Sequence, residues 1–262
     1  MYAVCHKMGS LISMQRRPYG RPSANFHSRW RAAFLTLAAC FVIPSRSLHG
    51  QQENSVSSFP LDSTAGLEVV NGKAEVATYR ERHSLHPIAI PGRSDPEDNE
   101  AVTVFLPGVD FKNGTIEADM AGSPLPGSRS DARGFIGIDF RSQEHGARTE
   151  SIYLRPTNAR ADDQLRRNHS VQYESLPDFP WLRLRKENPG VYESYTDLDA
   201  GAWTKVKIAV SGTKAELYVN GSDQPCLIVN DLKRGETHGQ IALWANWSTD
   251  AYFSNLTIRG DR

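Results

Sequence analysis

Segments in which apolar and polar residues alternate are the feature that most limits how this chain can fold. Three of them lie at residues 114–120, 134–141 and 151–155, with apolar positions at Ile116, Ala118, Met120, Ile136, Ile138, Phe140, Ile152 and Leu154. Successive side chains of a β-strand point to opposite faces, so each segment predicts a strand with one buried face. No stretch of ten or more residues shows a convincing helical period.

Turn signals separate further segments of the same kind. Asn71-Gly72, between residues 67–70 and 74–79, predicts a two-residue hairpin turn. Short strands with glycine and asparagine turns at this spacing predict an all-β fold, a sandwich of two antiparallel sheets. Trp203 and Ile241 are expected in its core because they occupy aromatic or alternating strand positions.

The first fifty residues have a different composition from the rest of the chain. They carry seven basic side chains and no acidic one, and an apolar run over residues 32–43 follows the basic region. This order is typical of an export signal. A run of about twelve residues spans roughly 18 Å as a helix, too short for a transmembrane anchor. We therefore expect a signal segment at 1–50, a linker at 51–58 and one domain at 59–262.

The N-terminal segment leaves two routes open for an exported, extracellular or periplasmic protein. Ordinary cleavage near Gly50 is one. The other is a lipoprotein, because Leu37-Ala-Ala-Cys40 resembles a lipoprotein box in which Cys40 is lipidated. Arg16-Arg17 is a third feature, a twin-arginine address, but it lies far from the apolar run.

Removing residues 1–50 changes the charge. The full chain has 30 basic and 30 acidic residues, and without the seven N-terminal basic residues 23 basic and 30 acidic remain, a net charge of −7. Nucleic-acid surfaces are basic, so this balance argues against a nucleic-acid partner. Cys226 is then the one cysteine left, which excludes an internal disulfide. The oligomeric state is not indicated.

The C-terminal third resembles the C-terminal half of concanavalin A-like jelly rolls, through the order W-T-K-V-K-I-A-V-S-G, A-E-L-Y-V-N-G, G-Q-I-A-L-W and A-Y-F-S-N-L-T-I. Over residues 60–260 the chain is similar to laminin-G-like and 3-keto-disaccharide hydrolase-type domains of secreted bacterial proteins. The resemblance implies a jelly roll with a carbohydrate ligand, bound or hydrolysed, on its concave sheet face. The alternative is an adhesion or structural module that recognises a protein partner.

Outward positions of the middle strands and the stretch after them supply the candidate ligand-binding residues. Sugar sites combine aromatic planes with arginine, aspartate and amide groups, and the residues of these types are Arg141, Tyr153, Arg155, Asn158, Gln172, Tyr173, Trp181 and Arg183. Residues 158–185 are expected to form a long, irregular loop, and such loops often carry function. A solvated sheet face with paired charges is the alternative interpretation.

Acid–base chemistry has candidates but no signature motif. Glycoside hydrolase family 16 relatives carry E-x-D-x-x-E or E-x-D-x-E on one strand, and neither string occurs here. Carboxyl groups that a partly buried face beside arginines would adjust for catalysis are Asp139, Glu117, Asp119 and Glu150. Alternation is expected to place six residues on one exposed polar face: Glu117, Asp119, Asp139, Arg141, Tyr153 and Arg155.

Metal ligands are few. His83 and His86 have a two-ligand spacing, but zinc needs three or four ligands. A structural calcium ion is left open, with oxygen ligands at Asp95, Asp98 and Asp250. No other cofactor is expected.

Overall fold

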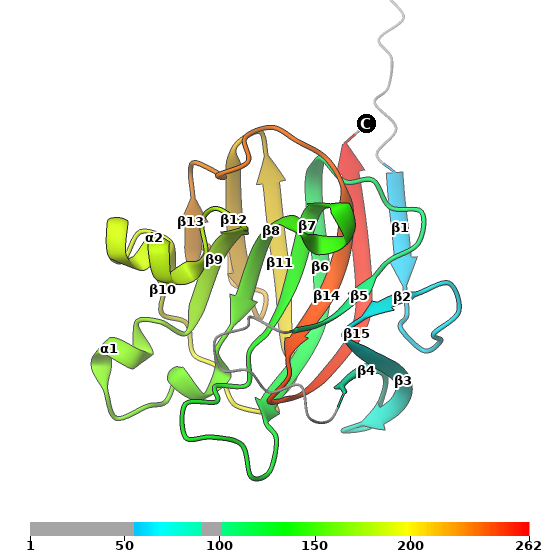
Figure 1. The fold of residues 1–262 in the computed structure, drawn as a ribbon, viewed down its shortest axis with the longest axis horizontal. Helices are drawn as coiled ribbons and strands as arrows, with labels where there is room; N and C mark the ends of the chain where they lie inside the picture. The colour runs from blue at the N-terminus through cyan, green and yellow to red at the C-terminus, as the bar shows by residue number, and fades with distance from the viewer. Residues whose placement is uncertain (1–54, 91–100, 262) are drawn as a thin grey trace, which may run out of the picture. The chain divides into compact units, whose positions relative to one another are not determined.

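Two antiparallel β-sheets form the computed structural model, which describes residues 55–90 and 101–261 (Figure 1). Sheet A contains, in spatial order, β13 (Leu227–Val229), β12 (Lys214–Val219), β11 (Thr204–Ser211), β6 (Asn113–Pro124), β15 (Thr249–Asp261), β4 (Arg82–Ala89) and β3 (Gly72–Tyr79), and β1 (Ser55–Phe59) pairs with β15. Sheet B contains β10 (Glu193–Ser194), β9 (Val171–Leu176), β8 (Arg148–Leu154), β7 (Ile136–Gln143), β14 (Gln240–Asn246), β5 (Ala101–Phe105) and β2 (Glu68–Val70). The predicted all-β sandwich is confirmed.

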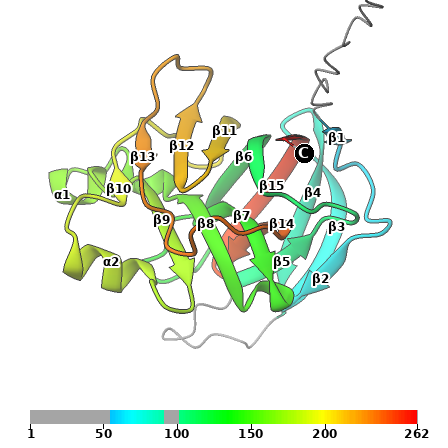
Figure 2. The ribbon, with the colours of Figure 1, turned by 90° about the horizontal axis from the view of Figure 1, so that it is seen from above.

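Figure 2 shows the sheets as two layers, with the short helices beside the β9–β10 edge of sheet B. The helical elements are α1 (Gln164–Arg167), α2 (Trp181–Glu187), and the 3-10 turns η1 (Glu144–Gly146) and η2 (Pro156–Asn158). Among the described residues, no helix has the length and apolar character needed to cross a membrane. Strand β1 begins at Ser55, within the predicted linker, and the expected export signal lies outside the described residues.

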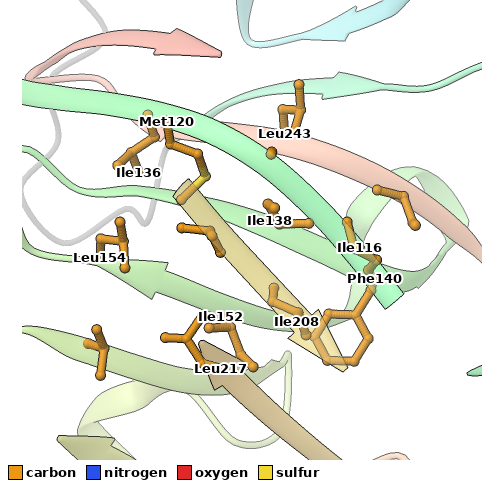
Figure 3. Close-up of a cluster of buried hydrophobic side chains, with 14 of the residues drawn as sticks. Ile116, Met120, Ile136, Ile138, Phe140, Ile152, Leu154, Ile208, Leu217 and Leu243 are labelled. Atoms are coloured by element: carbon orange, nitrogen blue, oxygen red, sulfur yellow. The ribbon is translucent and has the colours of Figure 1, made fainter. Parts of the chain in front are cut away.

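A core between the sheets contains the apolar positions that alternation predicts (Figure 3). Ile116 and Met120 of β6 and Ile138 and Phe140 of β7 are each at most 1% exposed. Burying one such side chain contributes about 1.5–3 kcal/mol, so the register of each strand is strongly specified. The inward residues thereby determine which side chains each sheet presents on its outer face.

The predicted hairpin at Asn71-Gly72 is wrong. Strand β2 pairs with β5 in sheet B, whereas β3 pairs with β4 in sheet A, so the chain passes between the sheets here. Asn71 has a φ of 61°, and a Cβ on Gly72 would lie 2.5 Å from the Ile88 carbonyl oxygen. The pair therefore permits a tight crossing. The two-residue hairpin lies at Arg80 and Glu81, which both have positive φ.

The expectation of an irregular loop over residues 158–185 is also wrong, because this stretch contains β9. This strand pairs with β8 along its whole length. Its sequence, V-Q-Y-E-S-L, alternates weakly because the polar Ser175 lies on the inward side with Val171 and Tyr173. The pairing with β8, rather than local pattern, specifies this strand.

Ile241 and Trp203 differ in burial, although both are expected in the core from the sequence. Ile241 is fully buried in the core. Trp203 is half-buried on the outer face of sheet A, and its Nε1 donates to the Tyr79 carbonyl oxygen at 3.3 Å. The core placement of Trp203 is wrong because its position is out of step with the inward Val206 and Ile208 of β11.

Replacing these two residues should therefore have unequal effects. Ile241→Ala should lower the free energy of unfolding by about 2–5 kcal/mol, because it leaves a cavity between the sheets. Trp203→Ala should cost less, about 1–2 kcal/mol, because the ring loses only part of a buried surface. Urea unfolding of both variants measures the difference. Equal losses would contradict the placement of Trp203.

Candidate functional site

Three strands of sheet B bring two carboxyl groups into one row on its outer face. The inward Ile138 and Phe140 leave Asp139 of β7 pointing outward. The register pairs Asp139 with Ser151 of β8, and Ser151 with Glu174 of β9. Residues paired in this way are neighbours on one face of a sheet. Asp139, Ser151 and Glu174 therefore form a row across the strands.

Both carboxyl groups of this row are buried, since Asp139 is 7% exposed and Glu174 is 4% exposed. Burial disfavours the charged form and raises the pKa of each group to about 7, and for Asp139 the charge of Glu174 adds to this effect. A hydrogen bond from Ser151 to Asp139 opposes the rise, as does one from the Trp181 N–H to Glu174 Oε2 at 3.0 Å. Near neutral pH the row can therefore both donate and accept protons.

Arg155 lies directly after β8, packed among aromatic rings. Its guanidinium carbon is 5.1 Å from the ring centroid of Tyr153, 5.4 Å from that of Trp181 and 5.7 Å from that of Phe135. Its Nη2 donates to the Tyr153 hydroxyl at 2.9 Å, and its Nη1 donates to Gln172 Oε1 at 3.2 Å. The structure thus brings together four predicted ligand-binding residues: Tyr153, Arg155, Gln172 and Trp181.

The expected exposure of Arg155 is wrong. This residue, Tyr153 and Gln172 are at most 4% exposed, whereas Trp181 is half-buried. The indole of Trp181, at the first turn of α2, lies against the guanidinium of Arg155. Because their polar groups bond one another, these side chains form a preorganised wall beside the carboxyl row.

Glu193 of β10 completes the polar network at this edge of the sheet. It accepts from Arg185 Nε at 2.9 Å, and its Oε1 lies 3.1 Å from His169 Nε2. Arg155 Nη1 is 3.9 Å from the same carboxylate. Burial lowers the pKa of His169, with the nearby Glu193 opposing it. Arg185 also stacks on the Trp181 ring, 4.7 Å from its centroid.

Trp244 of β14 contacts the middle of the row. Its Nε1 donates to Ser151 Oγ at 2.9 Å, and its ring meets that of Tyr153 edge-on at 5.1 Å. The register pairs Trp244 with Gly137 of β7. A Cβ at Gly137 would lie 2.6 Å from Trp244 Nε1 and 2.6 Å from Tyr153 Cβ. Glycine at this position therefore lets the indole lie across β7.

Arg141 does not share this face, and the prediction that it does is wrong. A register shift between Phe140 and Gln143 and a φ of 52° at Arg141 mark a β-bulge there. The fully buried side chain crosses the end of the sandwich and donates to the carbonyl oxygens of Lys112, Gly212 and Gly235. Arg141 is therefore a link between the sheets.

Glu150 and Tyr173 also lie inside the sandwich rather than on its outer face. They alternate inward with Ile152 and Val171, respectively. The Tyr173 hydroxyl donates to Glu150 Oε2 at 2.5 Å, and the Arg234 N–H donates to Glu150 Oε1 at 2.8 Å. Burial raises the pKa of Glu150. The placement of Tyr173 in an exposed loop is wrong because it belongs to β9.

The four remaining candidates differ in position: Glu117 and Asp119 lie on the other sheet, Arg183 lies on α2, and Asn158 lies next to Arg155, with which it shares the His169 carbonyl oxygen as acceptor. Glu117 and Asp119 belong to β6, so they face outward from sheet A, on the opposite side of the sandwich from Asp139. Their expected position on one face with Asp139 is wrong because alternation does not reveal sheet membership. Arg183 is exposed on α2 and donates to Glu187. Asn158 is buried in η2 and donates to the His169 carbonyl oxygen at 3.0 Å.

The calcium ligands stay a prediction. Asp95 and Asp98 lie outside the described residues. Asp250 Oδ1 is 3.9 Å from His86 Nε2. Over residues 55–90 and 101–261, no group of three histidine, cysteine, aspartate or glutamate side chains has an arrangement that would hold a metal ion.

Comparisons with known proteins bear on the fold. No protein-family model matches this chain, and no curated protein matches it. A Bacillus subtilis protein of unknown function with a galectin-like fold is similar at 14% identity and a TM-score of 0.50, over 78% of this chain and 94% of that one. The fold is a galectin-like jelly roll. The expected concanavalin A-like architecture is confirmed as a fold, and at this identity nothing more follows.

Two other solved structures match the jelly roll at lower TM-scores. Carbohydrate-binding module CBM66 from Bacillus subtilis matches at 17% identity and a TM-score of 0.49, over 74% of this chain and 95% of that one. Peanut lectin matches at 11% identity and a TM-score of 0.48, over 79% and 97% of the two chains.

Several residues of the jelly roll's outer face are not among the candidates predicted from the sequence: Phe135, Ser151, Glu174, Glu193 and Trp244. Ser151 and Trp244 occupy outward positions of strands that alternation predicts, so extending that pattern would have found them. Glu174 and Glu193 belong to β9 and β10, for which the sequence pattern is too weak.

Proposed function

We propose that this jelly roll binds a saccharide on the outer face of sheet B. The observation that carries the proposal is the row of Asp139, Ser151 and Glu174 between Trp244 on one side and Trp181 on the other. Saccharide sites combine aromatic surfaces with a few convergent carboxyl, hydroxyl and guanidinium groups. The carboxyl and hydroxyl groups of the row lie on three adjacent strands, and Trp244 of β14, Trp181 of α2 and Arg155 after β8 lie beside them.

The burial of the two carboxyl groups, Asp139 and Glu174, supports a functional role for them over a purely structural one. A buried carboxyl group costs stability unless a cation or several donors compensate its charge. Arg155 favours the charged form of Glu174 only through the attraction of its nearby charge. Among the described side chains, the Ser151 hydroxyl is the hydrogen-bond donor to Asp139. Neighbouring carboxyl groups with raised pKa values are a feature of functional sites.

The raised pKa values also favour a second candidate function, hydrolysis of a glycosidic bond. One protonated carboxyl group would give its proton to the glycosidic oxygen as the bond to the anomeric carbon breaks. The other carboxylate would take a proton from a water molecule whose oxygen bonds to that carbon. Asp139 and Glu174 lie two strands apart, so their Cα atoms are roughly 9–10 Å apart.

A glycan array and a panel of glycosides test the two functions together. The protein should bind at least one glycan, and Trp181→Ala should weaken that binding about tenfold or more, because a half-buried ring is lost from the wall of the site. Leu182→Ala is the matched control, since Leu182 is the next residue of α2 and points into solvent. Failure of the unmodified protein to bind any glycan would contradict the proposal.

Asp139→Asn and Glu174→Gln separate binding from hydrolysis, because each keeps the shape of the side chain and removes its proton transfer. If the protein hydrolyses a glycoside, each variant should lower kcat about 100-fold or more while retaining most of the affinity. Binding without turnover in the unmodified protein would leave the lectin-like function alone. Loss of turnover in the Leu182→Ala control would instead indicate a general structural effect.

We also propose that the protein is exported, because a basic region followed by an apolar run occupies residues 1–50. Mass spectrometry of the protein recovered from its natural host distinguishes the routes. A chain that starts near Gln51 indicates ordinary cleavage, and a lipid on Cys40 indicates a lipoprotein. An intact N-terminus on a cytosolic protein would contradict export.

A further inference from the structure

A hollow of about 950 Å³ opens on the outer face of sheet A, on the side of the sandwich away from Asp139 and Glu174. Ligand pockets commonly enclose about 300–1,000 Å³. Its lining comes from several segments that are distant in sequence, and the residues that matter most here are Arg82, Asp119, Trp203, Lys205, Asn220 and Asn255.

Asp119 lines this hollow. Its side chain is only 7% exposed, and it accepts from Arg82 Nη1 at 2.9 Å and from Asn255 Nδ2 at 2.9 Å. Lys205 Nζ lies 3.6 Å from its other oxygen. The register places Lys205, Asp119 and Ser254 in one row across β11, β6 and β15. The carboxylate is thereby held in a fixed orientation by groups from three other strands.

A β-bulge in β15 brings Asn255 to this site. Phe253 and Leu256 are fully buried, and the register shifts between Ser254 and Thr257. The bulge therefore lets both Ser254 and Asn255 line the outer face, and Asn255 adopts a φ of 52°. A positive φ on a residue other than glycine costs free energy, and such strain and bulges concentrate at functional sites.

The chemistry of the lining fits a neutral ligand rich in hydroxyl groups. Two cations, Arg82 and Lys205, are balanced by two carboxylates, Asp119 and Asp62, so neither a phosphate nor a metal cation meets uncompensated charge. Donors and acceptors alternate within one hollow, and a pair of adjacent hydroxyl groups can donate to the carboxylate while accepting from the cations. The Trp203 indole forms an aromatic wall, with Arg82 stacked 5.3 Å from its centroid.

We propose that this hollow is a second saccharide-binding site, which recognises a neutral sugar unit through adjacent hydroxyl groups. It uses residues of sheet A and does not depend on the site proposed for sheet B. If both sites are occupied, the domain binds saccharide on two opposite faces. A single polysaccharide-binding domain of this kind would cross-link two chains.

Two-dimensional NMR of the ¹⁵N-labelled protein tests the proposal, because the indole N–H groups report on the two faces separately. Trp203 reports on the hollow, whereas Trp181 and Trp244 report on sheet B. The probes are methyl glycosides of glucose, galactose, mannose and xylose at about 10 mM, enough to fill a site with a Kd of about 1 mM. At least one probe should shift the Trp203 resonance in a saturable way.

Two variants and a control complete the test. Asp119→Asn and Lys205→Ala should each weaken the titration seen at Trp203 about tenfold or more, because each removes one side of the hydroxyl recognition. Glu117→Gln is the matched control, since Glu117 lies on the same face of β6 but bonds to Arg259 outside the hollow. Lys205 is exposed, so Lys205→Ala should fold normally even if Asp119→Asn does not.

No shift at Trp203 with any probe would overturn the proposal, as would a shift that both variants retain. Shifts confined to Trp181 and Trp244 would overturn the second site and leave the site on sheet B intact. A shift at Trp203 that persists in the Asp139→Asn variant would support the second site independently of sheet B.

Discussion

The free energy of unfolding should fall as pH rises from about 4 to about 7, because Asp139 and Glu174 stay protonated longer in the folded protein than in the unfolded chain. Their pKa values rise from 3.8 and 4.5 to about 7. Between these pKa limits the unfolded chain has released protons that the folded protein keeps. Each rise of one pH unit therefore lowers the free energy of unfolding by up to about 1.4 kcal/mol per group. Below pH 4 both states are protonated, and above pH 7 both are ionised, so the loss is complete by about pH 8.

Other titrating groups have smaller effects over this range. Burial raises the pKa of Glu150, which acts in the same direction. Asp197, a carboxyl group with a lowered pKa, is exposed on the surface, where solvent screens its charge. Burial lowers the pKa of His169, which opposes the trend near pH 6. The two buried acids of sheet B should therefore dominate.

The isosteric variant Asp139→Asn isolates the effect. At pH 8 it should be more stable than the unmodified protein by on the order of 3 kcal/mol, because a neutral amide replaces a buried charge. At pH 4 the two should differ little. Urea unfolding at several pH values measures both differences, with Asp62→Asn on the exposed side of sheet A as the control. Equal destabilisation of Asp139→Asn at both pH values would show that the carboxylate is a structural acceptor.

A stabilising Asp139→Asn variant would also link stability to function. Groups that lower the stability of a protein at neutral pH are usually retained because they serve its function. If this variant gains stability and loses binding or turnover on the glycoside panel, the pair belongs to a functional site. A gain in stability without any effect on saccharides would remove the argument that carries the proposal for sheet B.

Alternation within strands made the core and the fold class predictable from the sequence. Ile116, Met120, Ile138 and Phe140 are buried as expected because the two-residue period is a local property of each strand. Sheet membership is not local. Glu117 and Asp139 both point outward, yet they belong to different sheets, and only the long-range pairing of β6 with β11 and β15 determines this.

The candidate site was less predictable, because irregular backbone and partners distant in sequence place its residues. The bulge at Arg141 reverses the expected direction of one side chain. Glu174 lies in the row because β9 pairs with β8, and neither its own segment nor its spacing from Asp139 indicates this. A row across three strands joins residues that are 12 and 23 positions apart, which no short motif describes.

Arg141→Ala should lower the free energy of unfolding by about 3–5 kcal/mol, since it removes a buried cation from a satisfied network. Nε donates to the Lys112 carbonyl oxygen at 2.8 Å, Nη1 to that of Gly235 at 2.8 Å, and Nη2 to that of Gly212 at 2.7 Å. Nη2 also donates to Asn113 Oδ1 at 3.1 Å. Truncation would remove the Arg141 donor from each of these part-buried acceptors, and a lost bond of this kind costs about 1–3 kcal/mol; Asn113 Oδ1 would still accept from the Gly212 N–H at 2.9 Å.

Arg141→Lys separates charge from geometry in this network. A lysine keeps the positive charge near Glu150, but its ammonium group has three donors and no planar fork, so it cannot bond all four of these acceptors at once. Arg141→Lys should therefore lower the free energy of unfolding by about half as much as Arg141→Ala. Arg183→Ala, on the exposed face of α2, is the control and should change stability by less than about 0.5 kcal/mol.

Because Arg141 joins the sheets and does not line the site, folded Arg141→Lys should bind saccharide as the unmodified protein does. Urea unfolding and the glycan array measure the two properties. Full stability with lost binding would mean that Arg141 contacts the ligand after all.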